Sequence, residues 1–196
     1  MNIFNAFRAP SRSDADWFSV GLVSSFPDLG SDDDNLLQPR RTCNTDDANL
    51  EPVPGCKVFQ VPPGNSSQST EVPLSADGLD LVESPESEIG ADLKDQVLVF
   101  QHKGKFHAID HKCPHSSFPL SQGTPFDIED FGIVLSAGLT CPKHGWSFDL
   151  FSGMADRGSY KLKVWEVQLR DLKPAPTDAA TKAEQEVWVR RKQRMG

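Results

Sequence analysis

The chain has 196 residues, which is enough for one domain with a hydrophobic core and rather short for two. Its formal net charge of -8 argues against a nucleic-acid-binding protein, because phosphate backbones are bound by concentrated Lys and Arg. The longest apolar runs are far shorter than the roughly 20 residues of a membrane-spanning helix, so we expect no span.

Residues 1–15 are expected to form an N-terminal extension ahead of the folded domain. They show no uninterrupted apolar core followed by a small-residue cleavage site, so we expect no secretory signal and a cytoplasmic location. Arg8 and Arg12 stand in a stretch without acidic residues, which weakly resembles a mitochondrial presequence and keeps that location as the alternative.

The first half of the chain alternates two expected strands with two polar segments. We predict strands over 17–22 and 57–61, each ended by proline-containing turns. Residues 30–54 are rich in Asp and Pro, and residues 64–95 are acidic and rich in Ser. Both segments are interpreted as loop-like insertions, although such long loops are uncommon in a compact domain.

The second half has denser β patterning. The apolar runs 97–100 and 106–109 flank Lys103-Gly104, which predicts a β-hairpin because glycine accepts positive φ. Short strands are also expected over 133–135, 146–150 and 187–189.

Two segments near the C-terminal end are less regular. The apolar positions alternate as Tyr160, Leu162 and Val164, then slip by one residue to Trp165, Val167 and Leu169. Such a slip predicts a bulge or a change of facing. Residues 177–186 are expected to be a short helix or a loop, and 193–196 a tail. The chain therefore reads as one all-β domain over residues 16–192.

The pattern with the clearest chemistry is Cys113-Pro114-His115, followed after twenty-five residues by Cys141-Pro142-Lys143-His144. Each short loop offers one thiolate and one imidazole. Such mixed loops suit a binuclear iron-sulfur cluster in which the two thiolates hold one iron and the two histidines hold the other. Replacing two thiolates by neutral imidazoles localises an added electron on the histidine-bound iron and raises the reduction potential.

Two other interpretations of these residues remain open. The cysteines could be ordinary core residues and the histidines surface residues that happen to lie close in sequence. Zinc is the stronger competitor, since two cysteines and two histidines also satisfy a tetrahedral site. Structural zinc motifs usually pair like ligands, however, whereas each loop here contributes one of each kind.

Residues 113–120 and 141–149 resemble the two cluster-binding loops of Rieske proteins. The resemblance covers about residues 17–190, interrupted by the two insertions. It implies an antiparallel β-sandwich with a small cluster-binding subdomain and one [2Fe-2S] cluster per chain. The ligands that it implies are Cys113, His115, Cys141 and His144.

Other residues indicate which kind of Rieske protein the chain resembles. Respiratory-chain members carry a loop-stapling disulfide at the positions of Phe118 and Lys143, and hydroxyl donors to the cluster at the positions of Trp146 and Phe148. Losing both donors leaves the reduced cluster less stabilised, so the resemblance implies a low potential and the soluble ferredoxin or oxygenase-ferredoxin type.

We predict no catalytic residue. Rieske oxygenases continue into a domain with mononuclear iron, for which the roughly fifty residues after His144 leave no room. His102, His107 and His111 are interpreted as surface or hairpin histidines and not as ligands.

The expected function is one-electron transfer from a reductase to an oxygenase-like acceptor, with protein redox partners. The alternatives are a redox-sensing or regulatory iron-sulfur module, or an accessory component of an oxidoreductase, and whether the chain is an enzyme stays open.

Several residues depart from the family pattern or lie outside it. Ser117 stands where many relatives have glycine, and charged residues occupy the expected third loop at 156–159. Cys43 and Cys56 are expected to be free thiols, with a labile disulfide or redox switch as the alternative.

Overall fold

The computed structural model describes residues 16–30, 37, 55–74, 93–172 and 184–192. The predictions for the extension 1–15, for most of the segment 30–54, for Cys43 and for the tail 193–196 lie outside these residues. Within them, the regular structure consists of strands and 3-10 helices of three residues each. No helix in the described ranges is long and apolar enough to span a membrane.

Eleven strands are present in the described part of the chain. In chain order they are β1 (Phe18–Leu22), β2 (Asp28–Leu29), β3 (Cys56–Gln60), β4 (Thr70–Val72), β5 (Gln96–His102), β6 (Lys105–Asp110), β7 (Thr124–Asp130), β8 (Ile133–Cys141), β9 (Trp146–Asp149), β10 (Glu166–Asp171) and β11 (Gln185–Arg190). The 3-10 helices are η1 (Val23–Ser25), η2 (Ser66–Gln68) and η3 (Leu120–Gln122).

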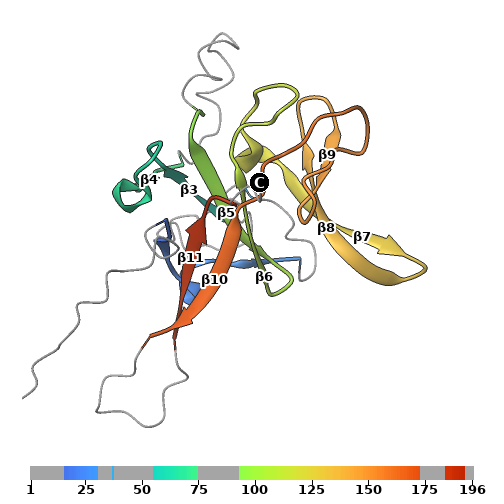
Figure 1. Cartoon of the computed structure of the whole chain (residues 1–196). Helices are drawn as coiled ribbons and strands as arrows, with labels where there is room; N and C mark the ends of the chain where they lie inside the picture. Colours follow the sequence, from blue (N-terminus) through green and yellow to red (C-terminus); the bar gives the residue numbers. More distant parts are fainter. Residues whose placement is uncertain (1–15, 31–36, 38–54, 75–92, 173–183, 193–196) are drawn as a thin grey trace, which may run out of the picture.

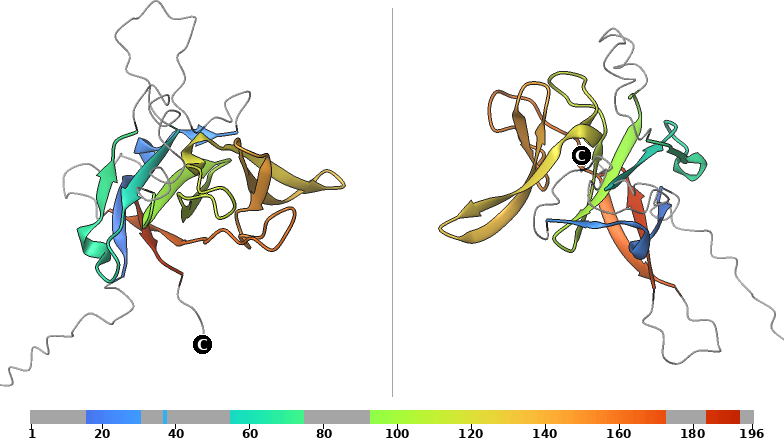
Figure 2. Two further views of the ribbon diagram at one scale, coloured as in Figure 1. Left: turned by 90° about the horizontal axis from the view of Figure 1, so that it is seen from above. Right: turned by 180° about the vertical axis from the view of Figure 1, so that it is seen from behind.

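The strands form three sheets (Figure 1). One has the order β1-β11-β10, and the second has the order β2-β5-β3-β4 with β6 also paired to β5. These two sheets pack together as a sandwich, while β7, β8 and β9 form a smaller lobe beside it. The views from above and from behind show the β7–β8 hairpin projecting away from the sandwich (Figure 2). All pairings are antiparallel except that of β2 with β5.

Strand β5 connects the two hydrophobic cores. Val97 and Val99 face the core of the sandwich, whereas Leu98 and Phe100 face the core that continues into the lobe. Because successive side chains of a strand point to opposite faces, a strand buried on both sides needs a continuous apolar run. The run 97–100, predicted as a strand, is this central element, and the all-β fold is confirmed.

Two finer predictions are also confirmed. Lys103 and Gly104 both have positive φ, 46° and 74°, which gives the hairpin between β5 and β6 the backbone twist of a type I′ turn. The slip after Val164 is a change of facing: Leu162 is buried in the core shared with the lobe, and Trp165 in the core of the sandwich.

Other expectations are wrong in part. Thr70–Val72, inside the predicted loop 64–95, forms β4 and pairs with β3, because Val72 can pack against the core there. Gln185 and Glu186, expected in a short helix or loop, belong to β11. Strand β7 was not predicted, since its residues are only partly buried and do not alternate cleanly.

Candidate metal centre

Two loops with the same closure meet at one end of the lobe. In the first, the N–H of Ser117 donates to the carbonyl of Cys113 at 2.9 Å; in the second, the N–H of Gly145 donates to the carbonyl of Cys141 at 3.0 Å. Ser117 and Gly145 both adopt positive φ, 55° and 67°. Each cysteine therefore starts a tight turn that closes four residues later, and the histidine lies inside that turn.

The two thiols lie together under the loops. Cys113 and Cys141 are buried, at 0% and 1% exposure. A hydrogen bond from Cys141, together with the hydroxyl and N–H of Ser116 and the N–H of His115, lowers the pKa of Cys113 to about 5. The hydrogen bond that the thiol of Cys141 donates to Cys113, together with burial, raises the pKa of Cys141. The Oγ of Ser116 also lies 3.7 Å from the sulfur of Cys141. The donors to Cys113 favour negative charge on its sulfur, which is the form that binds metal.

The two imidazoles lie together on the outer side. The ring centroids of His115 and His144 are 5.2 Å apart, and His144 is exposed. The Nδ1 atom of His115 is buried and has no hydrogen-bond partner within the described residues. A buried ring nitrogen without a partner is costly in a folded protein unless a ligand or ion engages it.

The four side chains thus form two pairs, thiols inside and imidazoles outside. Nowhere in the described ranges do three or more His, Cys, Asp or Glu side chains gather closely enough to hold one metal ion. A tetrahedral zinc site gathers its ligands around a single point, whereas a binuclear cluster takes two ligands on each of two irons. The division into a thiol pair and an imidazole pair therefore fits a [2Fe-2S] cluster, which takes two ligands of one kind on each iron.

A third segment braces the second loop. Trp146 stacks on His115 with centroids 4.2 Å apart, and the ring of Tyr160 lies edge-on, 5.2 Å from each of them. The guanidinium of Arg157 lies over Trp146 and donates to the carbonyl of Gly145 at 3.0 Å. The N–H of Asp156 donates to the carbonyl of Ser147 at 2.9 Å, and the N–H of Ser147 donates to the carboxylate of Asp156 at 3.2 Å. The charged third loop expected at 156–159 therefore holds the second loop and its stacked ring in place.

Sequence reasoning placed Ser116 in the first loop and Arg157 in the third but gave neither a role, and it did not assign Tyr160 to the site. An aromatic residue two positions after His144 was visible in the sequence, but its stacking partners come from a segment more than ten residues away. Only the tertiary arrangement brings them together.

The two positions associated with a disulfide in respiratory-chain Rieske proteins face each other here. The ammonium group of Lys143 lies 5.8 Å from the ring centroid of Phe118, a distance that allows a cation–π contact. Cys56, Cys113 and Cys141 are free thiols. Cys56 is buried, with its sulfur 3.5 Å from the carbonyl of Leu37, and burial raises its pKa to about 12. The described cysteine outside the site is therefore a free but unreactive thiol.

The three remaining histidines of the predicted set do not join the site. Of the interpretation as surface or hairpin histidines, the hairpin part holds for His102 and His107, which lie in the hairpin of β5 and β6. The surface part is wrong for His111, which is buried, and His102 is buried as well. His102 Nε2 lies 3.0 Å from a carboxylate oxygen of Asp127. Both ring nitrogens of His111 are engaged, at 2.8 Å each, by Gln96 and Ser121. They serve packing and internal hydrogen bonding.

Comparisons with known proteins agree with this geometry. Residues 76–168 match the family model of the Rieske [2Fe-2S] domain. The human Rieske domain-containing protein is 41% identical over 58 residues, which cover 30% of this chain and 34% of that protein. The ferredoxin component of the alkene monooxygenase system of Xanthobacter autotrophicus is 34% identical over 58 residues, again 30% of this chain and 41% of that protein. The matches therefore span less than half of these relatives.

Among solved structures, a chain of the complex of reduced oxygenase and oxidised ferredoxin in carbazole 1,9a-dioxygenase aligns with a TM-score of 0.42 and 15% identity, covering 93% of this chain and 99% of that chain. The family match and the two loops lead to one conclusion: this chain carries a Rieske [2Fe-2S] domain, and a [2Fe-2S] cluster is its cofactor.

Proposed function

We propose that the chain is a one-electron carrier whose cluster is held by Cys113 and Cys141 on one iron and by His115 and His144 on the other. The single observation that supports this ligand set best is the division of the four side chains into a buried thiol pair and an outer imidazole pair. When bound, such a cluster accepts and returns one electron, which localises on the histidine-ligated iron.

The chain's own residues suit transfer to another protein. The two thiols are buried and the hydroxyl of Ser116 lies beside them, so the inner side of the site is shielded from solvent. His144 is exposed and His115 is half-buried, so the imidazole edges give an electron its shortest path from the site to the protein surface.

A low reduction potential forms part of this proposal. Trp146 stacks on His115 and Phe148 is fully buried in the core, so neither carries a hydroxyl that could donate to a cluster sulfur. Hydrogen bonds to sulfur stabilise the reduced state, and their loss lowers the potential.

The route from a reductase to an oxygenase-like acceptor, with both partners proteins, is proposed by analogy with the Xanthobacter relative, a ferredoxin component of an alkene monooxygenase system. The cytoplasmic location remains a prediction of the sequence.

The cofactor and the carrier role are tested by aerobic purification, iron and acid-labile sulfide analysis, and an electron paramagnetic resonance spectrum of the reduced protein. We expect two irons and two sulfides per chain and a rhombic signal that appears with one electron. One zinc with no acid-labile sulfide would end the proposal. A ferredoxin reductase should reduce the protein rapidly and reversibly.

The ligand set is tested by His144→Cys. A thiolate in place of an imidazole adds negative charge to the outer iron, so the variant should keep a cluster and lower its potential. The matched control is His107→Gln, which removes a histidine outside the site and should leave the potential unchanged. An unchanged potential in His144→Cys contradicts the assignment of His144.

A further inference from the structure

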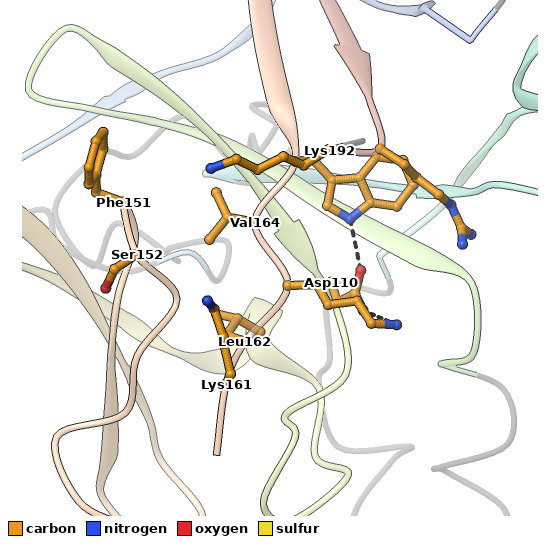
Figure 3. A pocket seen from close by; sticks show the side chains of 10 residues that line it. Asp110, Phe151, Ser152, Lys161, Leu162, Val164 and Lys192 are labelled. Atoms are coloured by element: carbon orange, nitrogen blue, oxygen red, sulfur yellow. Dashed lines mark hydrogen bonds and ion pairs between the residues drawn. The ribbon is translucent and has the colours of Figure 1, made fainter. Parts of the chain in front are cut away.

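A continuous groove runs between the sandwich and the lobe. One part is a cavity of ≈ 450 Å³ that includes Asp110, Phe151, Lys161 and Trp165 in its lining (Figure 3). The adjoining part is a cavity of ≈ 810 Å³ between β6 and β10 on one side and β8 on the other. Both parts share Phe151, Val164, Trp165 and Lys192, so we treat them as one sandwich–lobe groove.

Large apolar side chains project from the walls of this groove instead of packing inside. Phe151, which follows β9, is 83% exposed, and Leu135 of β8 is 65% exposed. Val134 and Leu169 are 49% and 42% exposed on facing walls. A cluster of projecting apolar side chains on the surface of a folded domain marks a binding face.

The same groove is basic on an acidic protein. It is lined by six cationic side chains: Lys103, Lys105, Lys161, Lys163, Arg191 and Lys192. The two carboxylates that line it are already engaged, Asp110 with Lys163 at 3.5 Å and Asp127 with Lys103. Lys105, Lys161 and Lys192 form no ion pair with any residue that the structure describes. The chain as a whole carries a net charge of -8. The groove therefore attracts negatively charged partners, whereas the rest of the surface attracts positively charged ones.

Part of the groove wall belongs to the segment that carries Tyr160 to the candidate metal centre. Lys161 directly follows Tyr160, whose ring centroid lies 5.2 Å from that of His115. The far wall is β10, the edge strand of its sheet. A chain segment lying in the groove would therefore lie between an open strand edge and the segment that holds Lys161.

We propose that the sandwich–lobe groove docks an acidic, apolar-bearing segment of a partner protein. Carboxylates of that segment pair with Lys105, Lys161 and Lys192, and its apolar side chains cover Phe151 and Leu135. A protein segment fits better than a small amphiphile, because the apolar groups project outward over two adjoining cavities instead of enclosing one. That the docked protein exchanges electrons with the cluster rests on the proposed function; the docking itself does not.

The test uses the holoprotein and a fluorescently labelled peptide of alternating Glu and Leu, with binding followed by anisotropy. We expect saturable binding that weakens as salt is raised, since exposed ion pairs are screened. A peptide with Lys in place of every Glu should not bind. No binding of the Glu/Leu peptide, or equal binding of both peptides, overturns the proposal.

Variants locate the contact. Lys161→Glu combined with Lys192→Glu should weaken peptide binding at least about tenfold, and Phe151→Ser should weaken it independently. Lys94→Glu, an exposed lysine outside both cavities, is the matched control and should bind like the wild type. Wild-type affinity in the double variant places the peptide elsewhere and overturns the proposal.

Two further measurements separate the alternatives. If dodecanoate below its micellar concentration binds the groove and the peptide does not, the occupant is a small anionic amphiphile and the proposal fails. Iron and sulfide are measured on the wild type and on every variant. A wild type without the cluster counts against the proposed function, whereas a variant that keeps its cluster and loses peptide binding has lost docking alone.

Discussion

At the scale of single residues, the first loop carries its own strain. Ser117 has a φ of 55°, in the left-handed region that costs an L-residue about 1–2 kcal/mol. Gly145 takes the equivalent position of the second loop at no such cost. The backbone N–H of Ser117 donates to the carbonyl of Cys113 in this conformation. The loop is therefore closed by the backbone, and the side chain of Ser117 is not needed for it.

Ser117→Gly should therefore stabilise the protein, by up to about 1 kcal/mol, or about 2–4 °C in melting temperature for a chain of this size. The measurement is thermal unfolding of the holoprotein followed by circular dichroism at one scan rate. Ser159→Gly is the control, since Ser159 is exposed and has no positive φ, and it should melt slightly lower than the wild type. A lower melting temperature for Ser117→Gly would show that the serine side chain contributes more than its backbone costs.

Phe148→Tyr should raise the reduction potential. Phe148 lies in the core beside the loops, and a hydroxyl there can donate to a cluster sulfur. One hydrogen bond worth about 0.5–1.5 kcal/mol corresponds to about 20–60 mV for one electron.

The measurement is a redox titration followed by electron paramagnetic resonance. Phe106→Tyr, the same change at a partly buried residue packed against the sandwich core, should leave the potential where it is. An unchanged potential in Phe148→Tyr with full iron content would argue against the low-potential explanation.

At the scale of elements, the turn after β9 joins the lobe to the segment that leads back into the sandwich. The N–H of Gly153 donates to the carbonyl of Asp149, and the N–H of Leu162 donates to the carbonyl of Gly153, both at 2.8 Å. A Cβ at Gly153 would collide with the carbonyl oxygen of Leu162, and its φ of 75° disfavours side chains as well. The two segments can lie this close only because residue 153 is a glycine.

Gly153→Ala should consequently cost about 3 kcal/mol or more, since backbone must move on one side of the contact. Gly64→Ala is the matched control. Its φ is 80° and nothing lies within 4 Å of an added Cβ, so the substitution should lower the free energy of unfolding by only about 1–2 kcal/mol, through the backbone conformation alone. Melting temperature and the yield of iron-loaded protein are compared for the two. Equal losses would mean that the close approach at residue 153 contributes nothing.

At the scale of the whole molecule, patterns that are local in sequence were predictive. The apolar run of β5, the hairpin at Lys103-Gly104 and the two short loops with one cysteine and one histidine each depend on neighbouring residues only. Strand β4 could not be predicted, because its polar residues become a strand only by pairing with β3.

The brace of Trp146, Arg157 and Tyr160 and the sandwich–lobe groove likewise arise from segments that meet only in three dimensions. The positive φ of Ser117 could be suspected from its position but not established.

The face of β6 that is turned toward the lobe also sets how the whole protein responds to acid, because His107 lies there against Phe100. Burial, with smaller contributions from His102 and Lys105, lowers the pKa of His107 to about 4 from an ordinary value of 6.5. The unfolded chain therefore binds a proton at this residue more readily than the folded chain between these two values. The contribution of neutral His107 to the free energy of unfolding is fully present above about pH 6.5. It falls as the pH drops toward 4 and changes no further below that.

Between pH 7 and pH 5 this single residue should cost the folded state about 2 kcal/mol, or about 4–8 °C in melting temperature. His107→Gln removes the titration while keeping a polar side chain, so it should lose correspondingly less stability over the same interval. Acid damage to the cluster acts on both proteins alike and cancels in the comparison. If the melting temperatures of the wild type and the variant fall by the same amount between pH 7 and pH 5, the neutral imidazole of His107 is not what makes the protein sensitive to acid.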